Sequence, residues 1–437
     1  MGIRRKLALC RLLFQTAVFL GLLMLIGAFT VRTLDRYPTS QWGKTELAVR
    51  HLDALRAAFH EQDAARRMQQ YFPEGACFAL TLYGLAWSNL AAAGERRGEA
   101  LREIEWALRE QEKPYVTAPF QATQVPMGVF YLGQNNLLLG KYLSAFENPS
   151  DRPAAAVERF HRQSALLHDA FMASPIRHLH TYPGMCWPAD NVTALTSLLV
   201  HDQLYATKYH DAYEAWKSFT TAHADPVTSM TPGMVNADTG EPVQTARGCA
   251  NAWNLAMLAE LDPMYAMSQY QLFKRHFGIR RLGFQMFREY PAGHDRKADV
   301  DSGPIIWGAG VVATGVGLAA ARANGDDEMV QDIHALANSF GWARRVKVGA
   351  RQGAQYLFGL LPMGDAFLAW GYSLPCMPHL GYVPEPRVHW PLYWAISAIV
   401  TLLLVRGWFI GRGWRRWWEG GRAAPAVSDM IAAEEAP

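Results

Sequence analysis

Two short stretches of the sequence bring together side chains that could transfer protons. Residues 186–191, CWPADN, place a thiol, an acid and an amide beside an aromatic ring, and residues 298–310, ADVDSGPIIWGAG, place two acids two positions apart. A carboxylic acid withdrawn from water has a raised pKa, which suits it to acid/base work near neutral pH. The candidate catalytic residues are therefore Cys186, Asp190, Asp299 and Asp301.

Further polar and aromatic residues could complete a pocket around these groups. Tryptophans beside both stretches would supply apolar walls, and amides in other helical segments would orient a ligand. The candidate substrate-binding residues are Gln134, Asn135, Trp187, Asn191, Cys249, Asn251 and Trp307.

An ordinary structural role is the alternative for both stretches, because each precedes an apolar helical segment. Asp190 or Asn191 in the first stretch, and Asp301 or Ser302 in the second, are residue types that cap helix N-termini. A cap needs only one acid, whereas the second stretch has two. We expect one of these two acids to cap the helix that follows, and Asp299 to face the pocket.

The sequence favours neither a metal nor an organic cofactor. His178, His180 and His294 resemble metal ligands only in fragments, because no third ligand follows at a helical spacing. The motif GAGVVA at 308–313 matches a dinucleotide-binding pattern but lacks the preceding strand and the βαβ unit that such a site requires. We therefore predict no cofactor and no metal.

From residue 42 to about residue 371 the pattern of apolar residues is that of helices. Segments such as ELAVRHLDALRAAFHEQDAARRM place apolar residues at i, i+3 and i+4, and connectors rich in Pro and Gly separate them. Only GFQMFREY at 283–290 suggests a strand. Eleven or twelve helices, alternately richer and poorer in small residues, predict an all-α fold, namely an (α/α)6 toroid.

Two apolar spans flank this helical region. Residues 12–31 contain no charge, and residues 388–410 are interrupted only by Arg406, so both are long enough to cross a hydrocarbon core of roughly 30 Å. We predict a basic tail at 1–11, transmembrane helices at 12–31 and 388–410, a barrel domain at 32–387 and a second tail at 411–437. Cleavage of the first span as a signal peptide is the alternative, and the sequence does not decide between them.

Basic residues lie on the terminal side of both spans, at Arg4, Arg5, Lys6 and Arg11 and again at Arg412, Arg415 and Arg416. The positive-inside rule therefore predicts both termini in the cytoplasm and the barrel domain on the other side. A composition of 12% aromatic residues and 19% charged residues agrees with membrane contact, an aromatic pocket, or both.

Net charge and cysteine content bound the partners. A formal net charge of +3 is too small to indicate nucleic acid, so the predicted partners are a small-molecule substrate and the membrane. The oligomeric state is left open. Cys77, Cys186, Cys249 and Cys376 lie in the exported region, where two disulfides could form, but their spacing identifies no pairing.

Several longer segments resemble the linalool dehydratase/isomerase family. They are CWPADNVTALTSLLVHDQLYATKYHDAYEAWKSF from Cys186, ANAWNLAMLAELDPMYAMSQYQLFKRHF at 250–277, LYGLA at 82–86 and FYLGQNNLLLG at 130–140. The resemblance extends over about residues 75–325 and rests on overall pattern, so this chain would be a divergent, membrane-anchored member. It implies an (α/α)6 barrel and a cofactor-independent acid/base dehydration and isomerisation of a small terpene alcohol in the periplasm. That setting implies that the membrane is the inner membrane of a bacterium, with the domain on its periplasmic side.

The family's catalytic groups carry over only in part. Its site is similar to a cluster of two cysteines, a histidine, a tyrosine and an aspartate. Cys186 lies at or next to the first cysteine position, but the second falls at Leu195 or Thr196. The histidine position falls at Gln134 and the tyrosine position at Cys249. The resemblance therefore implies the fold more strongly than the catalytic residues.

Three functions remain open. A membrane-tethered lyase or isomerase acting on a small hydroxylated, isoprenoid-like substrate predicts a mostly apolar pocket that contains Cys186. A carbohydrate-active enzyme of the cell envelope, similar to a glycosidase, predicts an open cleft with two carboxylates facing across it. A non-catalytic binding or scaffold module predicts that Asp190, Asp299 and Asp301 all serve as helix caps.

Overall fold

The structure is a computed structural model that describes residues 3–375 and 390–419 of the 437-residue chain. Cys376, residues 388–389 of the predicted second span, and residues 1–2 and 420–437 of the two predicted tails lie outside the described residues. The chain divides into two compact units. One is Arg36–Pro386, called here the helical unit, and the other consists of Met1–Asp35 and Arg387–Pro437. Most of the described residues are helical, as predicted.

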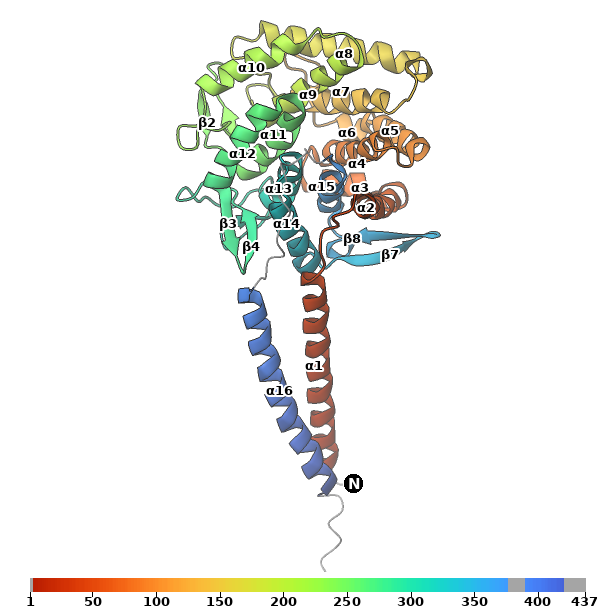
Figure 1. Cartoon of the computed structure of the whole chain (residues 1–437), viewed down its shortest axis with the longest axis vertical. Coiled ribbons are helices and arrows are strands. Elements are labelled where there is room, and N and C mark those ends of the chain that lie inside the picture. Colours follow the sequence, from red (N-terminus) through yellow and green to blue (C-terminus); the bar gives the residue numbers. More distant parts are fainter. Residues whose placement is uncertain (1–2, 376–389, 420–437) are drawn as a thin grey trace, which may run out of the picture. The chain divides into compact units, whose positions relative to one another are not determined.

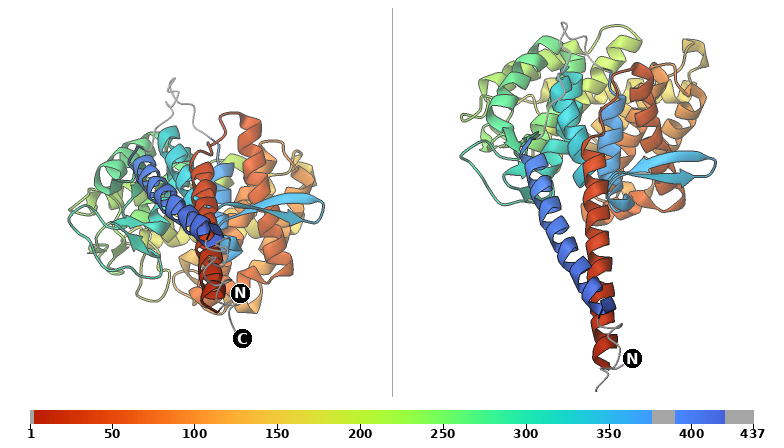
Figure 2. Two further views of the ribbon diagram at one scale, coloured as in Figure 1. Left: turned by 90° about the horizontal axis from the view of Figure 1, so that it is seen from below. Right: turned by 60° about the horizontal axis from the view of Figure 1, so that its bottom comes forward.

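The terminal segments contain two long helices, α1 (Ile3–Thr33) and α16 (Trp390–Glu419). Figures 1 and 2 show them side by side, and the Trp414 indole N–H donates a hydrogen bond of 3.0 Å to the Thr16 hydroxyl. By length and composition, both are able to cross a membrane. The described part of the predicted spans, residues 12–31 and 390–410, lies within these helices.

The helical unit contains α-helices of ordinary length joined by short connectors. They are α2 (Gln41–Glu61), α3 (Ala64–Tyr71), α4 (Gly75–Ala92), α5 (Arg97–Gln111), α6 (Pro114–Thr117), α7 (Gly128–Ser144), α8 (Ala154–Ala173), α9 (Pro188–Leu204), α10 (His210–Ala222), α11 (Gly248–Leu261), α12 (Pro263–Phe277), α13 (Val311–Ala323), α14 (Asp327–Phe340) and α15 (Pro362–Ser373). Short 3₁₀ helices lie at η1 (Pro149–Asp151) and η2 (Leu357–Gly359).

Six of these helices contact one another in cyclic order. Each of α4, α7, α9, α11, α13 and α15 packs against the next, and α15 packs against α4. Their sequences are rich in apolar and small residues on all faces, as in GACFALTLYGLAWSNLAA of α4, and a helix of that kind is stable only when it is surrounded by protein. We call these six the ring helices.

The other long helices of the unit each pack against one or two ring helices. Helices α2, α5, α8, α12 and α14 do so directly, and α10 contacts both α8 and α9. They are amphipathic, as in DEMVQDIHALANSF of α14, where Met329, Val330 and Ile333 are buried. Asp326 caps α14 by accepting a hydrogen bond of 3.1 Å from the Met329 N–H.

The strands form only two-stranded antiparallel hairpins within the described residues. The pairs are β1 (Met234–Val235) with β2 (Pro242–Gln244), β3 (Gly278–Arg281) with β4 (Phe284–Phe287), β5 (Ile305–Ile306) with β6 (Ala309–Gly310), and β7 (Arg344–Val348) with β8 (Arg351–Gln355). The strand predicted within residues 283–290 is confirmed as β4. The β7–β8 hairpin was not predicted, because only two valines alternate with its charged residues.

Candidate functional site

A cavity of about 250 Å³ lies where the N-terminal ends of the ring helices meet. Every ring helix contributes lining residues, either from its first turns or from the loop just before it. The lining residues are Phe72, Glu74, Phe78, Phe130, Gln134, Thr181, Tyr182, Trp187, Ala189, Asp190, Gly233, Arg247, Cys249, Ala250, Trp253, Val300, Asp301, Val312, Val316, Met363 and Phe367. The walls are thus mostly apolar and aromatic, with a few polar groups among them.

Two glycines allow the loops to approach the ring helices closely. A Cβ at Gly128, the first residue of α7, would lie 2.1 Å from the Thr181 carbonyl oxygen, and Gly128 has a φ of +74°. A Cβ at Gly248, the first residue of α11, would lie 2.0 Å from the Arg288 carbonyl oxygen. Both helix starts are therefore held against loop backbone that carries, or directly precedes, residues of the site.

Asp190 lies in the first turn of α9 and faces the cavity. Its carboxyl accepts a hydrogen bond from the Thr181 hydroxyl. The pKa of Asp190 is raised to about 7, first by burial and also by the nearby carboxylates of Glu74 and Asp301, while the Thr181 hydrogen bond works in the opposite direction. Near neutral pH Asp190 is therefore present in both its protonated and its ionised form.

Glu74, which directly precedes α4, supplies a second carboxylate to the cavity wall. The phenol of Tyr182 donates a hydrogen bond to Glu74 Oε1. Burial and this carboxylate both raise the pKa of Tyr182 well above its ordinary value, so the phenol remains a hydrogen-bond donor. A carboxylate held by a neutral phenol thus lines the same cavity as Asp190.

Arg247, just before α11, binds the acids on another side of the cavity. Its Nε donates to Glu289 Oε1 at 2.7 Å and its Nη2 donates to Asp299 Oδ1 at 2.8 Å. Asp301 Oδ2 lies 3.7 Å from Arg247 Nη1. The guanidinium therefore fixes the position of the Asp299–Asp301 loop relative to α11, and Glu289, which is fully buried, fixes the guanidinium.

The two cysteines of the candidate site are neutral thiols. Cys249 Sγ lies 3.1 Å from Glu289 Oε1, and burial together with that carboxylate raises the pKa of Cys249 well above its ordinary value. Cys186 is fully buried, donates to the Leu179 carbonyl at 3.4 Å, and also has a raised pKa because of burial. Cys249 lines the cavity and Cys186 does not. Neither thiol has the lowered pKa of a nucleophilic cysteine.

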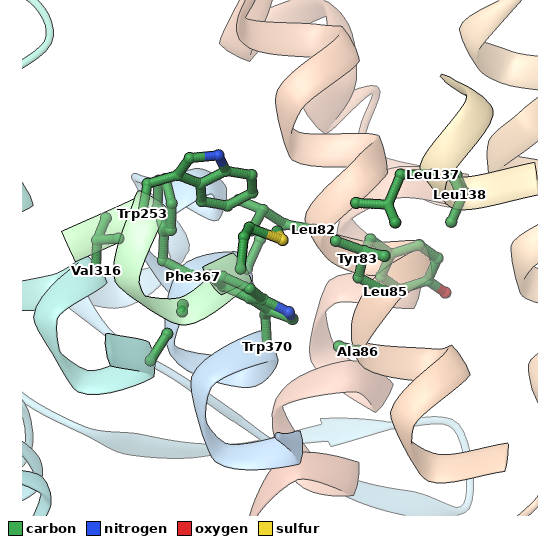
Figure 3. Close-up of a cluster of buried hydrophobic side chains, with 14 of the residues drawn as sticks. Leu82, Tyr83, Leu85, Ala86, Leu137, Leu138, Trp253, Val316, Phe367 and Trp370 are labelled. Carbon is green, nitrogen blue, oxygen red and sulfur yellow. The ribbon is translucent and has the colours of Figure 1, made fainter. Parts of the chain in front are cut away.

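Aromatic rings form the apolar part of the wall. Phe78 lies edge-on to Trp253 and to Phe367, with ring centroids 5.0 and 5.2 Å apart. Figure 3 shows Trp253 and Phe367 grouped with Trp370, whose ring centroid lies 4.9 Å from that of Trp253. Because these rings come from α4, α11 and α15, the same packing that joins the ring helices builds the wall.

Gln134 of α7 presents an amide to the cavity. The side chain is 1% exposed, and its Oε1 has no hydrogen-bond partner within the part of the chain that the structure describes. A buried amide oxygen without a partner is energetically costly, and a ligand hydroxyl would remove that cost. Gln134 is therefore a candidate for binding a polar group of a ligand.

The cavity contains some of the predicted site residues and not others. Gln134, Trp187, Asp190, Cys249 and Asp301 line it. Asn191 and Asn251 instead bind backbone: Asn191 accepts from the Leu179 N–H at 2.7 Å, and Asn251 donates to the Thr231 and Arg247 carbonyls, both at 3.0 Å. These two asparagines hold the loops that carry the site.

Three further predicted residues also lie outside the cavity lining. Asn135 donates to Gln111 Oε1 at 3.0 Å in the buried interior. Trp307 is 63% exposed. The Asp299 carboxylate accepts hydrogen bonds from Arg247 and, at 2.9 Å, from the Ser302 backbone N–H. Of the two neighbouring acids, Asp301 rather than Asp299 is in the lining.

The prediction that Asp299 or Asp301 caps the helix after it is wrong, and the alternative that Asp190 or Asn191 caps α9 is not observed either. Helix α9 begins at Pro188 with Trp187 in the cap position, and α13 begins at Val311 with Gly310 in that position, in both cases without a side-chain cap. The stretch after Ser302 forms the β5–β6 hairpin before the helix starts. Asp190 lies inside the first turn, where the loop residue Thr181 satisfies its carboxyl instead.

Sequence reasoning missed Glu74, Thr181, Tyr182, Arg247 and Glu289. Tyr182 and Glu74 are 108 residues apart, so no local pattern joins them. The only sequence signal is a charged residue directly before an apolar helix, at Glu74 and again at Arg247. Among the described residues, no three His, Cys, Asp or Glu side chains are grouped so as to hold a metal ion. Cys10, Cys77, Cys186 and Cys249 are free thiols.

Comparison with known proteins does not assign the chain to a family. No family model matches the sequence, and no curated protein matches it significantly.

Proposed function

We propose that the helical unit is an (α/α)6 toroid and a divergent member of the linalool dehydratase/isomerase family. The cyclic contacts of the six ring helices, each backed by neighbouring helices, support the toroid. The cavity at the N-terminal ends of those helices supports a single site built by the whole ring.

We also propose that α1 and α16 span the bacterial inner membrane and that the helical unit lies on its periplasmic side. Basic residues at the terminal ends of both helices support this orientation, among them Arg4 and Arg5 before the first apolar stretch and Arg415 and Arg416 after the second.

For the activity, we propose a cofactor-independent acid/base elimination or isomerisation of a small hydroxylated substrate, isoprenoid in character. One observation carries this proposal: the Asp190 carboxyl, with a pKa of about 7, faces a mostly apolar cavity that also contains the Glu74 carboxylate. The cavity volume of about 250 Å³ is below the roughly 300–1,000 Å³ of pockets that bind drug-sized molecules, which favours a small substrate.

In the proposed reaction, protonated Asp190 donates its proton to the substrate hydroxyl. The C–O bond breaks, its electron pair leaves with water, and Glu74 takes a proton from the neighbouring carbon as the C–H pair becomes a C=C bond. The products are an alkene and water, and proton exchange with solvent restores Asp190 and Glu74. For isomerisation, water adds back at another carbon by the reverse steps.

The remaining residues have supporting roles in this proposal. The rings of Phe78, Trp253 and Phe367 would stabilise positive charge that develops on carbon as the hydroxyl leaves. The Gln134 amide would accept a hydrogen bond from the substrate hydroxyl and direct it toward Asp190. Tyr182 would keep Glu74 oriented through its hydrogen bond.

A glycosidase-like activity on envelope carbohydrate is the second candidate. It is favoured by the presence of three carboxylates in one lining, Glu74, Asp190 and Asp301, of which Asp301 is 60% exposed. Two carboxyl groups on either side of a sugar ring are the equipment of glycoside hydrolysis. The large apolar share of the wall favours the first candidate.

The test uses the full-length protein in lipid nanodiscs, as wild type and as Asp190→Asn. Each is incubated with a set of isoprenoid alcohols and, separately, with an envelope glycan extract, and the products are identified by mass spectrometry. The matched control is Glu103→Gln, which changes a carboxyl outside the cavity lining. We expect loss of water from an isoprenoid alcohol, or its isomerisation, by wild type and the control but not by Asp190→Asn.

Release of sugars in place of alkenes would replace the first candidate with the second. If neither substrate set changes while all three proteins remain folded, both catalytic proposals fail, and a binding or scaffold role becomes the better account.

A further inference from the structure

An apolar loop next to the β7–β8 hairpin points its large side chains into solvent. Leu357, Phe358, Leu360 and Leu361 are 44, 54, 70 and 39% exposed. They lie within five consecutive residues between β8 and α15, and together with the basic residues of β7 they form what we call the hairpin patch. Apolar residues gathered in this way on a surface commonly mark a binding site.

The backbone of this loop is held in a form that keeps the apolar side chains outside. Leu357 and Phe358 have φ angles of +47° and +59°, which residues with a Cβ rarely adopt. The Leu357 N–H donates to the Gly341 carbonyl at 2.6 Å, and the Gly359 N–H donates to the Tyr356 carbonyl at 2.8 Å. Strained backbone of this kind persists only where the surrounding structure fixes it, and it is concentrated at functional sites.

The hairpin adds positive charge beside the apolar loop. Arg344, Arg345 and Lys347 of β7 are exposed, and none of them forms an ion pair within the described residues. The Arg344 guanidinium lies 5.8 Å from the centre of the Phe358 ring, which joins the basic and apolar halves of the patch. By contrast, Arg351 of β8 is neutralised by Asp53 and Glu99 at 2.9 and 2.7 Å.

The hairpin patch lies near the points where the chain enters and leaves the helical unit. Tyr37 stacks on Tyr372 with ring centroids 5.7 Å apart, and the Tyr372 hydroxyl lies 3.1 Å from that of Tyr356, which directly precedes the patch. At the other end of the unit's chain, Arg322 donates to the Leu374 carbonyl at 2.7 Å and its guanidinium lies 5.7 Å from the Tyr37 ring. Tyr37 and Leu374, near the two ends of the unit's described chain, therefore lie close to this region.

We propose that the hairpin patch docks on the surface of an anionic lipid bilayer. Phe358 and the leucines would insert among the headgroups and upper acyl chains, and Arg344, Arg345 and Lys347 would bind lipid phosphates. This proposal goes beyond the catalytic one and rests on the proposed membrane spans of α1 and α16. Docking would fix the orientation of the helical unit on the membrane.

Charge and tether length favour a membrane over a protein partner. An anionic bilayer has negatively charged headgroups at its surface and apolar acyl chains beneath them. The exposed cations of the patch complement the headgroups, and its exposed apolar side chains complement the acyl chains. Only Leu34, Asp35 and Arg36 separate the end of α1 from Tyr37, and so short a segment extends at most roughly 14 Å. A membrane that contains α1 is thus always within reach of this end of the unit.

The test places a photo-crosslinking p-benzoylphenylalanine at Phe358 or at Leu360 in the full-length chain. The protein is reconstituted in nanodiscs of phosphatidylglycerol and phosphatidylcholine, illuminated, and analysed for lipid adducts by mass spectrometry. Val243 of β2, which is 58% exposed, is the control site in the same unit. Figure 1 shows strand β2 away from the β7–β8 hairpin. Leu402 of α16, 70% exposed, tests the membrane span itself.

We expect lipid adducts at positions 358, 360 and 402 but not at 243. Replacing Arg344 and Arg345 by glutamine should lower the adducts at 358 by roughly fivefold or more, as should a purely zwitterionic bilayer. Adducts at 402 with none at 358 and 360 above the level at 243 would overturn docking while leaving the span intact. Crosslinks at 358 and 360 to a second copy of the chain in place of lipid would also overturn it. Absence of adducts at 402 would refute the span on which the proposal rests.

Discussion

Burial acts to raise the pKa of two carboxyl groups of the helical unit, Asp190 and Glu103, but their pKa values are shifted in opposite directions. Glu103 of α5 accepts hydrogen bonds of 2.8 Å from both the Tyr83 hydroxyl and His60 Nε2. Burial works to raise its pKa, but these two donors outweigh burial and leave the pKa below its ordinary value. Asp190 accepts one hydrogen bond from Thr181 and lies near two other carboxylates, so its pKa rises to about 7.

The two residues differ in the hydrogen-bond donors and cations around them. Glu103 has two donors and the Arg56 guanidinium nearby, which suits a group that stabilises the fold. Within the part of the chain that the structure describes, Asp190 forms no ion pair, and it faces the cavity, which suits a group that exchanges protons with a ligand. A buried acid alone therefore does not identify a site, whereas an acid without enough donors at the wall of a cavity does.

The largest expected effect is on the reaction rate of Asp190→Asn. We expect the rate with the substrate identified above to fall by roughly 10²- to 10⁴-fold, because general acid–base catalysis contributes that much. The midpoint of thermal unfolding should stay the same or rise, since the substitution removes a carboxyl that is costly to ionise in the folded state. Retention of the full rate would end the catalytic role of Asp190.

For Glu103→Gln we expect a change in stability and no change in rate. Loss of the charge that His60 and Tyr83 support should lower the free energy of unfolding by about 1–3 kcal/mol, with the rate per folded molecule unchanged. Denaturant unfolding measures the first quantity and product formation the second. Glu105→Gln, on the same helix but with its partner Arg109 in an exposed pair, should change stability by less than about 0.5 kcal/mol. If Glu103→Gln lost activity without losing stability, the claim that Glu103 stabilises the fold while Asp190 acts in catalysis would be wrong.

The two acids should also respond oppositely to pH. The folded-state pKa of Asp190 is raised, so its contribution favours folding at low pH and weakens as pH rises from about 4 to about 7. Glu103 has a lowered folded-state pKa, so its stabilisation is present above the ordinary pKa of a glutamate and is lost as pH falls through the folded-state value.

For catalysis, the protonated form of Asp190 decreases about tenfold per pH unit above about 7, and the rate should fall with it. A rate profile between pH 5 and 9 and unfolding curves of wild type, Asp190→Asn and Glu103→Gln would measure these trends. A rate that is flat across pH 7 would be the contrary result.

The smallest of these effects is expected for Gln134→Leu, which tests whether the unpartnered amide contacts the substrate. We expect kcat/KM to fall by roughly tenfold, because one neutral hydrogen bond to the substrate is lost, while the fold should be slightly stabilised. Asn135→Leu, one residue along the same helix but outside the cavity, should instead destabilise the protein, since Asn135 binds Gln111. Equal kinetic effects of the two changes would argue against contact with the substrate.

Local patterns in the sequence predicted the helices and the two apolar spans. The amphipathic helices carry the expected spacing, and α1 and α16 contain the described parts of the predicted spans, because apolar length is a property of the sequence alone. Capping was predicted less well. Asp190 has the right residue type for a cap, but the loop containing Thr181 returns to α9 and binds its carboxyl. Such a contact depends on the packed fold.

Only part of the candidate site was predicted from the sequence, again because its contacts depend on the packed fold. Asp190 and Asp301 were found because they occur in unusual stretches. Glu74 and Arg247 were not found, because each is a single charge whose partners are distant in the sequence. Tyr182, the partner of Glu74, lies 108 residues away. Glu289 and Asp299, the partners of Arg247, lie 42 and 52 residues away. The helices determine which of these residues meet, and that information resides in their packing.

The most direct test of the account is the titration of Asp190 itself. Infrared difference spectra of the full-length protein in nanodiscs, recorded from pH 4 to 9 for wild type and for Asp190→Asn, isolate the carbonyl band of the protonated Asp190 carboxyl. The account predicts a band that is absent from the variant and disappears with a midpoint at about pH 7. A midpoint near pH 4, the ordinary value for an aspartate, would contradict it.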